Sequence, residues 1–238
     1  MQAVILAAGQ GKRLQPLTND IPKAMVKIKG KPMLQIIIEQ LKTVNVNEIV
    51  VIVHYKKEKI IEYFGDGLNF GVKIHYVEQK EMKGTGDALL HAEPYITEEK
   101  FLCIACDSLF DTNLLKNILA HESDGVITAK EVDDAKRFGI LETEGKKVTR
   151  IIEKPENPPT NLANFSVYLF PKVIFDKLKL IQPSSRGEYE VTDAIQLLID
   201  DQYDFGYEIA DSIVDIGTIE QLQEAESLGQ KLENTPNE

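Results

Sequence analysis

A short segment near the amino terminus carries the residue types that bind a nucleoside triphosphate. The apolar run Ala3–Leu6 leads into the small-residue sequence at positions 7–11, and Lys12 and Arg13 follow. Small residues let backbone N–H groups approach a phosphate closely, and an arginine fork matches phosphate oxygens. Together with Lys23, the segment predicts a buried strand that runs into a triphosphate-binding loop.

This segment differs from the two common phosphate-binding loops. The dinucleotide fingerprint G-x-G-x-x-G requires a third glycine where this chain has Leu14. The P-loop requires a glycine where this chain has Leu6, and Ser or Thr where it has Arg13. The simpler alternative is an ordinary strand-to-helix turn with surface cations. Two glycines, Arg13 and the Pro22-Lys23 pair, all after one strand, disfavour that alternative.

Two carboxylates follow apolar stretches far apart in the sequence. Asp107 comes just after the run Phe101–Ala105, and Asp215 lies in Val-Asp-Ile-Gly-Thr before the last predicted helix. Carboxylates at strand ends suit Mg²⁺, which takes one or two protein carboxylates together with phosphate oxygens and water. Taken alone, each aspartate is more often a helix N-cap or a turn residue.

These motifs together resemble the sugar-nucleotide pyrophosphorylases, which are sugar-1-phosphate nucleotidyltransferases. The resemblance rests on L-A-A-G-x-G-x-R-L-x-P-L-T from Leu6, P-K-A-M-V from Pro22 and G-K-P-M-L from Gly30. It extends along nearly the whole chain, which resembles glucose-1-phosphate thymidylyltransferase and the N-terminal domain of N-acetylglucosamine-1-phosphate uridylyltransferase. Lys12 departs from the family, which usually carries Thr or another small residue there.

The resemblance implies a role for each matched residue. Arg13 and Lys23 would be catalytic and would neutralise charge on the triphosphate and the leaving pyrophosphate. Asp107 and Asp215 would hold Mg²⁺ as the cofactor. The nucleotide would contact Leu6, Ala7, Ala8, Gly9, Gly11, Lys12, Gln79, Gly84 and Thr85. The sugar phosphate would contact Gly139, Glu153, Lys154, Asn164 and Glu188.

Gln79, followed by Gly84 and Thr85, resembles the segment with which the family binds the base. A glutamine amide offers a donor and an acceptor, so we expect Gln79 to accept from N3–H of uracil or thymine and to donate to a carbonyl. Without the resemblance, a helix N-terminus with a small-residue turn would be the preferred interpretation. We therefore expect dTTP or UTP, with a slight preference for dTTP and glucose-1-phosphate. UTP with N-acetylglucosamine-1-phosphate and GTP with mannose-1-phosphate are the alternatives.

The implied reaction is an in-line attack by the sugar-phosphate oxygen on the α-phosphorus of the NTP, with departure of pyrophosphate. The attacking phosphate is already nucleophilic, so positioning and charge neutralisation should supply most of the catalysis. A catalytically silent nucleotide-sensing relative is the main alternative from another class, and the presence of Arg13, Lys23, Asp107 and Asp215 disfavours it. A nicotinamide-dependent oxidoreductase is disfavoured by the failed fingerprint.

The composition of the chain limits the classes of binding partner and the cellular location that we expect. The chain has 238 residues and a net charge of −11, which argues against nucleic-acid or anionic-membrane partners because both require basic surface. No stretch approaches the ~20 apolar residues of a membrane span, and no charged leader precedes the first strand, so we expect a cytoplasmic protein. Cys103 and Cys106 fall in an apolar run and are expected to be buried rather than redox-active or metal-binding. Whether the chain forms a homo-oligomer is left open.

The elements that position these residues alternate between strand and helix. This alternation predicts a Rossmann-like three-layer α/β/α fold with a mixed, mainly parallel central sheet and a partly antiparallel extension over the active cleft. Residues 1–232 should form one domain, with a nucleotide-binding half at 1–110, a sugar-phosphate-binding half at 111–232 and a polar tail at 233–238. Strands are expected at 3–6, 48–54, 72–77, 101–105, 125–130, 139–142, 148–153, 163–170 and 205–209. Helices are expected at 32–44, 57–64, 84–92, 171–178, 191–200 and 218–232.

Overall fold

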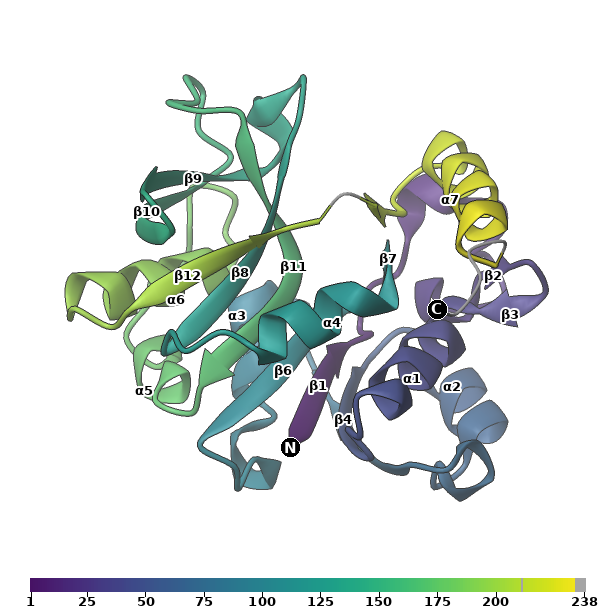
Figure 1. The fold of residues 1–238 in the computed structure, drawn as a ribbon. Coiled ribbons are helices and arrows are strands. Elements are labelled where there is room, and N and C mark those ends of the chain that lie inside the picture. The colour runs from purple at the N-terminus through teal and green to yellow at the C-terminus, as the bar shows by residue number, and fades with distance from the viewer. Residues whose placement is uncertain (211, 234–238) are drawn as a thin grey trace.

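A nine-stranded mixed sheet runs through the centre of the molecule, in the order β5-β4-β1-β6-β11-β8-β12-β10-β9 (Figure 1). The computed structural model describes residues 1–210 and 212–233 of the chain. The sheet strands are β1 (Gln2–Leu6), β4 (Glu48–Val53), β5 (Lys73–Glu78), β6 (Lys100–Ala105), β8 (Gly125–Glu131), β9 (Gly139–Glu144), β10 (Lys147–Glu153), β11 (Leu162–Pro171) and β12 (Phe205–Ile209).

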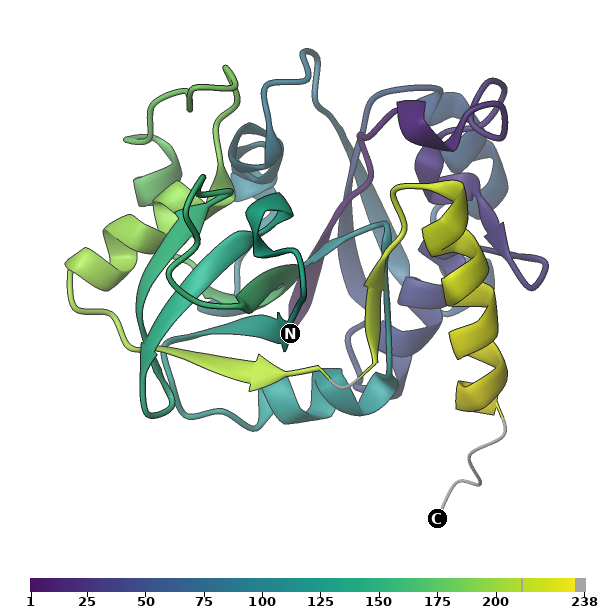
Figure 2. The same cartoon turned by 90° about the horizontal axis from the view of Figure 1, so that it is seen from above.

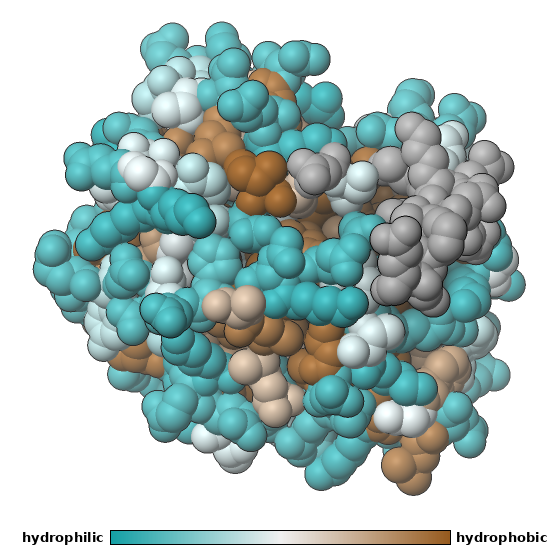
Figure 3. All heavy atoms as spheres, viewed as in Figure 1, coloured by the Kyte–Doolittle hydropathy of each residue, from teal (hydrophilic) through white to brown (hydrophobic). Residues whose placement is uncertain are grey.

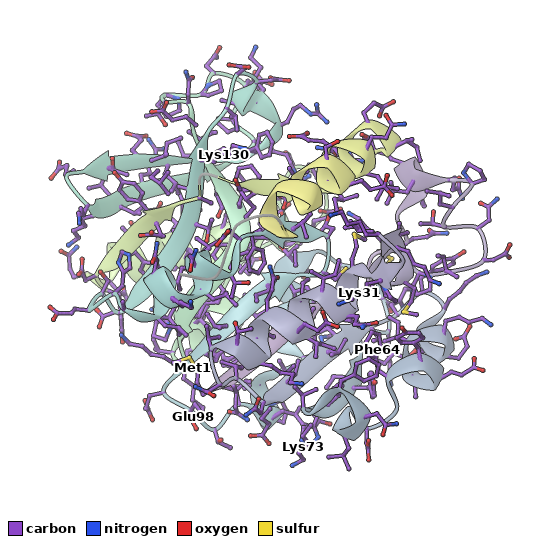
Figure 4. All side chains as sticks on the ribbon, turned by 45° about the vertical axis from the view of Figure 1, so that its right-hand side comes forward. Met1, Lys31, Phe64, Lys73, Glu98 and Lys130 are labelled. Carbon is purple, nitrogen blue, oxygen red and sulfur yellow. The ribbon has the colours of Figure 1, made fainter. Side chains whose placement is uncertain are left out.

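The first half of the sheet is entirely parallel. β1 lies between β4 and β6, and β5 pairs with the outer edge of β4, all in the same direction. β1, β4 and β6 are nearly continuous apolar runs because both faces of the sheet are covered there, whereas the edge strand β5 alternates polar and apolar residues. Their carboxyl ends, at Leu6, Val53, Glu78 and Ala105, therefore share one edge of the sheet. Met1, Lys73 and Glu98 lie at the opposite, amino ends of these strands (Figure 4).

The second half of the sheet is mixed. β11 runs antiparallel to both β6 and β8, whereas β12 is parallel to β8. β9 and β10 form an antiparallel hairpin in which Glu153 lies opposite Gly139. The hairpin pairs with β12 through Lys147 and with β11 through Ile140, so it closes this end of the sheet. The expected antiparallel extension is therefore confirmed.

Helices cover both faces of the sheet and complete the predicted three layers. One face packs against α1 (Met33–Thr43), α2 (Lys57–Phe64) and α4 (Thr112–Leu119), and the other against α3 (Thr85–Leu90), α5 (Ile174–Leu178) and α6 (Val191–Asp200). α1 and α4 lie in front of the sheet in Figure 1. Each helix buries one apolar stripe, as an amphipathic helix on a sheet must.

A third, smaller apolar cluster joins the end of the chain to its beginning. β7 (Ser108–Phe110) pairs antiparallel with β13 (Ile213–Asp215), and α7 (Ile219–Glu233) packs beside β2 (Lys27–Ile28) and β3 (Lys31–Pro32), as Figure 2 shows. Val214, Leu222 and Ala225 pack here with Leu14 and Val26. The cluster brings the C-terminal aspartate to the amino-terminal loop.

The structure corrects several sequence-based expectations. The helix predicted at 171–178 begins only at Ile174, because β11 continues through Pro171. α4, β7 and β13 were not predicted, and all three are short. The predicted tail lies outside the described residues except for Glu233, where α7 ends.

The two cysteines are buried, as the apolar run around them predicts. Cys103 and Cys106 are both buried, and they belong to the apolar clusters on opposite faces of the sheet. The face seen in Figure 3 is mostly hydrophilic, with small separate apolar patches. Within residues 1–210 and 212–233, no helix is long and apolar enough to cross a membrane.

Candidate active site

The loop after β1 is shaped by Gly11. The backbone N–H of Ala7 donates to Ile52 O at 2.8 Å, which fixes the start of the loop against β4. Gly11 has a φ of +70°, and a Cβ there would lie 3.0 Å from Cγ2 of Thr18 and 3.1 Å from Cβ of Lys23. The Thr18 hydroxyl donates to Gly11 O at 2.8 Å. A side chain at position 11 would therefore strain the backbone and displace Lys23.

The other small residues of the predicted loop leave its backbone accessible. Ala7 and Ala8 are buried, Leu6 is half-buried at the end of β1, and a Cβ on Gly9 would meet no atom within 4 Å. Gly9 therefore faces open space next to the loop backbone. This leaves room for a phosphate against the peptide groups.

The three cations of the loop have different surroundings. Lys12 and Arg13 begin a short 3-10 helix at Lys12–Leu14 and are exposed, whereas Leu14 is fully buried and anchors the turn. A Cβ added to Gly217 would lie 2.7 Å from Nη2 of Arg13, so the guanidinium rests against the segment after β13. Lys23 is mostly buried and forms an ion pair with Asp107.

Asp107 and Asp215 are brought together by the β7–β13 pair. Asp215 lies in register with Ser108, whose hydroxyl donates to Asp215 Oδ1 at 2.6 Å. Burial, reinforced by the nearby Asp107 carboxylate, raises the pKa of Asp215 to about 7, although Ser108 and Lys23 oppose the shift. Burial alone would lower the pKa of Lys23, but the attraction and hydrogen bond of Asp107, together with Cys106 and Asp215, outweigh burial and raise the pKa.

The donor set of this carboxylate pair fits a divalent cation. Two repelling carboxylates share one partly buried site with a single lysine, and an added cation would relieve that repulsion. Across the described ranges, no group of three or more His, Cys, Asp or Glu side chains is placed to hold a metal. Two carboxylates that leave positions for phosphate oxygens and water are what Mg²⁺ prefers.

The predicted base-binding segment lies at the same sheet edge. Gln79 follows β5, is only 3% exposed, and its backbone N–H donates to Val53 O at 2.9 Å. Its side-chain Nε2 donates to Gly84 O at 3.1 Å and to Asp87 Oδ2 at 2.8 Å. Both amide protons are therefore used inside the protein, which corrects our expectation that this amide also donates to a base carbonyl.

The predicted sugar-binding residues converge on the hairpin. A Cβ on Gly139 would lie 3.2 Å from Glu153 Oε2 and 3.3 Å from Asn164 Nδ2, so the three positions are adjacent. Thr192 donates to Glu153 Oε2 at 3.2 Å, and Asn164 Nδ2 donates to the Tyr168 hydroxyl at 2.9 Å. Asn164 Oδ1 is buried without a partner among the described residues. A buried polar atom of this kind requires a partner, which a water molecule or a ligand hydroxyl would supply.

Sequence reasoning missed one cation here, Arg186. Its Nη2 lies 3.1 Å from Glu153 Oε1, 2.7 Å from Glu190 Oε1 and 3.5 Å from Glu188 Oε2. Lys154, with a φ of +41°, lies 3.0 Å from the same Glu153 oxygen. In the sequence, Arg186 lies two residues before the predicted Glu188, so a cation next to that carboxylate was the available signal.

The two cations offset a crowded set of carboxylates. Burial, followed by Glu190 and Glu153, raises the pKa of Asp193. A cavity of about 380 Å³ opens beside this cluster. It is lined by Arg150, Ile151, Ile152, Glu153, Lys154, Ser184, Ser185, Arg186, Asp193 and Gln196. Of the predicted sugar-phosphate residues, Glu188 is half exposed and lies 3.5 Å from Arg186.

Tyr189 ties the base segment to the sugar segment. Its backbone N–H donates to Lys83 O at 2.7 Å, and its carbonyl accepts from the Gly86 N–H at 2.8 Å. The Val191 N–H donates to the hydroxyl of Thr85 at 3.2 Å. Only a glycine at position 84 permits this contact, because its φ is +105° and a Cβ there would lie 2.5 Å from Tyr189 O. Two backbone hydrogen bonds and one to a side-chain hydroxyl therefore hold the base segment against residues 189–191.

Comparison with known proteins identifies the family. The family described as nucleotidyl transferase matches residues 2–231. The chain belongs to the nucleotidyl transferase family. It is 44% identical over 205 residues to the UTP–glucose-1-phosphate uridylyltransferase AglF of Haloferax volcanii, with 84% of each chain covered. It is 42% identical over 203 residues to the bifunctional protein GlmU of Methanocaldococcus jannaschii, which covers 85% of this chain but only 48% of that protein.

Solved structures of family members have the same fold. A Bacillus anthracis protein described as a glucose-1-phosphate thymidylyltransferase superposes with a TM-score of 0.85 at 26% identity, covering 100% of this chain and 97% of that one. A UDP-glucose pyrophosphorylase in complex with UDP-glucose gives a TM-score of 0.82 at 25% identity, with 97% and 98% covered. The predicted Rossmann-like α/β fold and the predicted family are thus confirmed, and the chain is an enzyme of the sugar-1-phosphate nucleotidyltransferase class.

Proposed function

We propose that the enzyme transfers a uridylyl group from UTP to glucose-1-phosphate and releases pyrophosphate, with Mg²⁺ as the cofactor. The observation that carries the choice of a base with a ring N–H, as in uracil and thymine, is the fixed Gln79 amide, whose donors are bound to Gly84 and Asp87 and whose oxygen is free for an N–H group. The likeness to a UTP–glucose-1-phosphate uridylyltransferase supports UTP and glucose-1-phosphate in particular. This revises the slight preference for dTTP drawn from the sequence.

In this proposal the triphosphate binds along the loop after β1. Backbone groups of Ala8 and Gly9 would contact its phosphates, and Lys12 would add a cation at the rim. Arg13 would neutralise the charge that grows on the departing pyrophosphate. Its position against Gly217 supports this role, because the guanidinium then lies within the turn that follows Asp215.

Asp107 and Asp215 are the residues that would hold Mg²⁺. The ion supplies charge neutralisation at the phosphates when it is bound. Lys23 would turn from Asp107 toward the phosphates once the ion replaces it. The buried Ser108 hydroxyl would keep Asp215 in the orientation that it has here.

The sugar phosphate would bind between the hairpin and α6. Glu153 and the buried, unpartnered Oδ1 of Asn164 would accept hydrogen bonds from sugar hydroxyls, and Gly139 beside them would present its backbone to the ring. Lys154 and Arg186 would hold the phosphate, with Glu188 beside them. Holding this anion beside the metal site converts a bimolecular encounter into an oriented attack. Residues 1–110 would thus bind chiefly the nucleotide, and residues 111–232 chiefly the sugar phosphate.

A second candidate substrate pair is dTTP with glucose-1-phosphate. It is favoured by the likeness to a structure described as a glucose-1-phosphate thymidylyltransferase. Thymine offers Gln79 the same N3–H as uracil, so this amide does not distinguish them.

Release of pyrophosphate from a matrix of five NTPs and several hexose-1-phosphates, with and without Mg²⁺, tests the proposal. We expect the highest kcat/KM for UTP with glucose-1-phosphate and no turnover after chelation. A higher kcat/KM for ATP or GTP would contradict the choice of a pyrimidine. A higher value for another sugar would contradict the choice of glucose.

A further inference from the structure

The side-chain nitrogen of Gln79 is surrounded by two hydrogen-bond acceptors and no donor. Its Nε2 lies 3.1 Å from the carbonyl of Gly84 and 2.8 Å from a carboxylate oxygen of Asp87. No described residue donates to its Oε1, and that oxygen is not among the sealed atoms without a partner. The amide is therefore held by its nitrogen, and its oxygen is open.

This environment fixes the sense of the amide. The nitrogen and oxygen of a glutamine are assigned from their partners, and here both partners are acceptors. In the reversed amide, the oxygen would face the Gly84 carbonyl and the Asp87 carboxylate, and two hydrogen bonds would become two repulsions. Since the side chain is only 3% exposed, water has little access to compensate.

A base read by the open oxygen must bring an N–H group. Uracil and thymine carry a proton on N3, as guanine does on N1, whereas N3 of cytosine and N1 of adenine carry lone pairs. The glutamine can thus select among bases because its amide cannot rotate to exchange the donor for the acceptor. Cytosine is the sharpest comparison, because it has the same ring size as uracil and differs along this edge.

We infer that Asp87 is the positioning residue that sets this selectivity by locking the Gln79 amide. Asp87 lies in the first turn of α3, eight residues beyond Gln79, with its side chain 20% exposed. The helix is held in place by buried Ala88 and Leu89 and by the Gly86 N–H bonded to Tyr189 O. The inference rests on the proposed function, because it explains how the same nucleotide site rejects cytosine.

The test compares kcat/KM for UTP and for CTP in four proteins. These are the wild type, Asp87→Ala, Asp87→Asn and the control Glu81→Ala. Glu81 is a carboxylate of the same segment that pairs with Lys83 and is 72% exposed. Its removal therefore changes the local charge by the same amount without touching Gln79.

In Asp87→Ala, one acceptor is lost and the amide can reverse, so we expect the UTP-to-CTP ratio to fall about tenfold. In Asp87→Asn, the carboxamide can turn its oxygen toward Gln79 Nε2, and the Gly84 carbonyl still favours the native sense. The ratio should then stay within about threefold of the wild type, as should that of Glu81→Ala. A ratio unchanged in Asp87→Ala, or lost equally in Asp87→Asn, would overturn the inference.

A second measurement detects the fixed orientation of the Gln79 amide without any turnover. In ¹⁵N-labelled enzyme, the Gln79 NH₂ signals, identified by their absence in Gln79→Ala, should show slowed proton exchange that Asp87→Ala abolishes and Asp87→Asn retains. Signals that Asp87→Ala leaves unchanged would overturn the inference. An enzyme that shows this lock but releases pyrophosphate with no NTP would refute the proposed function instead, so the two failures are distinct.

Discussion

The two halves of the sheet present their binding groups in different ways. In the parallel half, the groups follow the carboxyl ends of neighbouring strands, as with the loop after Leu6, Gln79 after β5 and Asp107 after β6. In the mixed half, Gly139 and Glu153 face each other across a hairpin, and Asn164 lies within β11. Parallel topology alone positions the nucleotide-binding groups, whereas strand register positions the sugar-binding groups.

Both halves nevertheless use an amide in the same manner. Gln79 has its Nε2 bound to Gly84 and Asp87, and Asn164 has its Nδ2 bound to the Tyr168 hydroxyl. In each amide, the carbonyl oxygen has no partner among the described residues. A bound NH₂ group and an unpartnered oxygen give a fixed acceptor, which selects ligands by their N–H or O–H groups.

The largest effect is expected where the two halves meet, at the carboxylate pair. Asp107→Asn and Asp215→Asn should each lower kcat by roughly a hundredfold to a thousandfold, because the phosphates lose charge stabilisation. Initial rates at saturating substrates measure this, and thermal unfolding is the control, since both variants should remain folded. Wild-type rates in either variant would remove that residue from the metal site.

The next prediction separates the halves by kinetic parameter. Arg13→Ala should lower kcat by about a hundredfold, because the charge that it neutralises grows as pyrophosphate leaves. Lys154→Ala should instead raise KM for the sugar phosphate by about tenfold, because that charge is present before the reaction. Steady-state rates with each substrate varied in turn provide both values. If Lys154→Ala weakened only NTP binding, the sugar-phosphate half would be assigned wrongly.

A third substitution tests whether the halves are coupled through Tyr189. Gly84→Ala would place a Cβ 2.5 Å from Tyr189 O at a φ of +105°, so the base and sugar segments should separate. We expect KM to rise several-fold for both substrates. Gly145→Ala is the matched control, because Gly145 has a φ of +60° but no atom within 4 Å of an added Cβ. A rise confined to one substrate would show that the segments act independently.

The smallest effect concerns pH and the stability of the metal-free enzyme. The pKa of Asp215 is raised to about 7, so the native state holds a proton that the unfolded state loses near pH 4. The stability of chelated enzyme should therefore fall as pH rises from about 4 to about 7, and the fall should be reduced in Asp215→Asn. Because Mg²⁺ and the proton compete, Mg²⁺ should raise Tm more at pH 8 than at pH 5. An equal rise at both pH values would contradict this.

The sequence predicted the parallel half almost completely. Long β-branched or apolar runs identify β1, β4, β5 and β6, and the loops at their ends carry motifs that are contiguous in the chain. α4 was missed although Asp111 caps it, accepting from the Asn113 N–H. The helix is short and follows β7 directly, so its start is hidden in an apolar run.

The site itself was harder to predict than the fold. Contacts such as Arg13 with Gly217, or Ser108 with Asp215, join residues about a hundred or more positions apart and depend on the three-residue strand β13. The orientation of the Gln79 amide depends on two acceptors that no motif specifies. Arg186 was missed because its partners are carboxylates from three separate positions, Glu153, Glu188 and Glu190.

The central claim is that one half of the sheet reads the nucleotide and the other half reads the sugar phosphate. Measuring kcat/KM for UTP and for glucose-1-phosphate in Gln79→Ala and Asn164→Ala tests it most directly. We predict that Gln79→Ala lowers the value for UTP by about tenfold and leaves that for glucose-1-phosphate nearly unchanged, and that Asn164→Ala does the reverse. Equal losses for both substrates in both variants, or exchanged losses, would contradict the account.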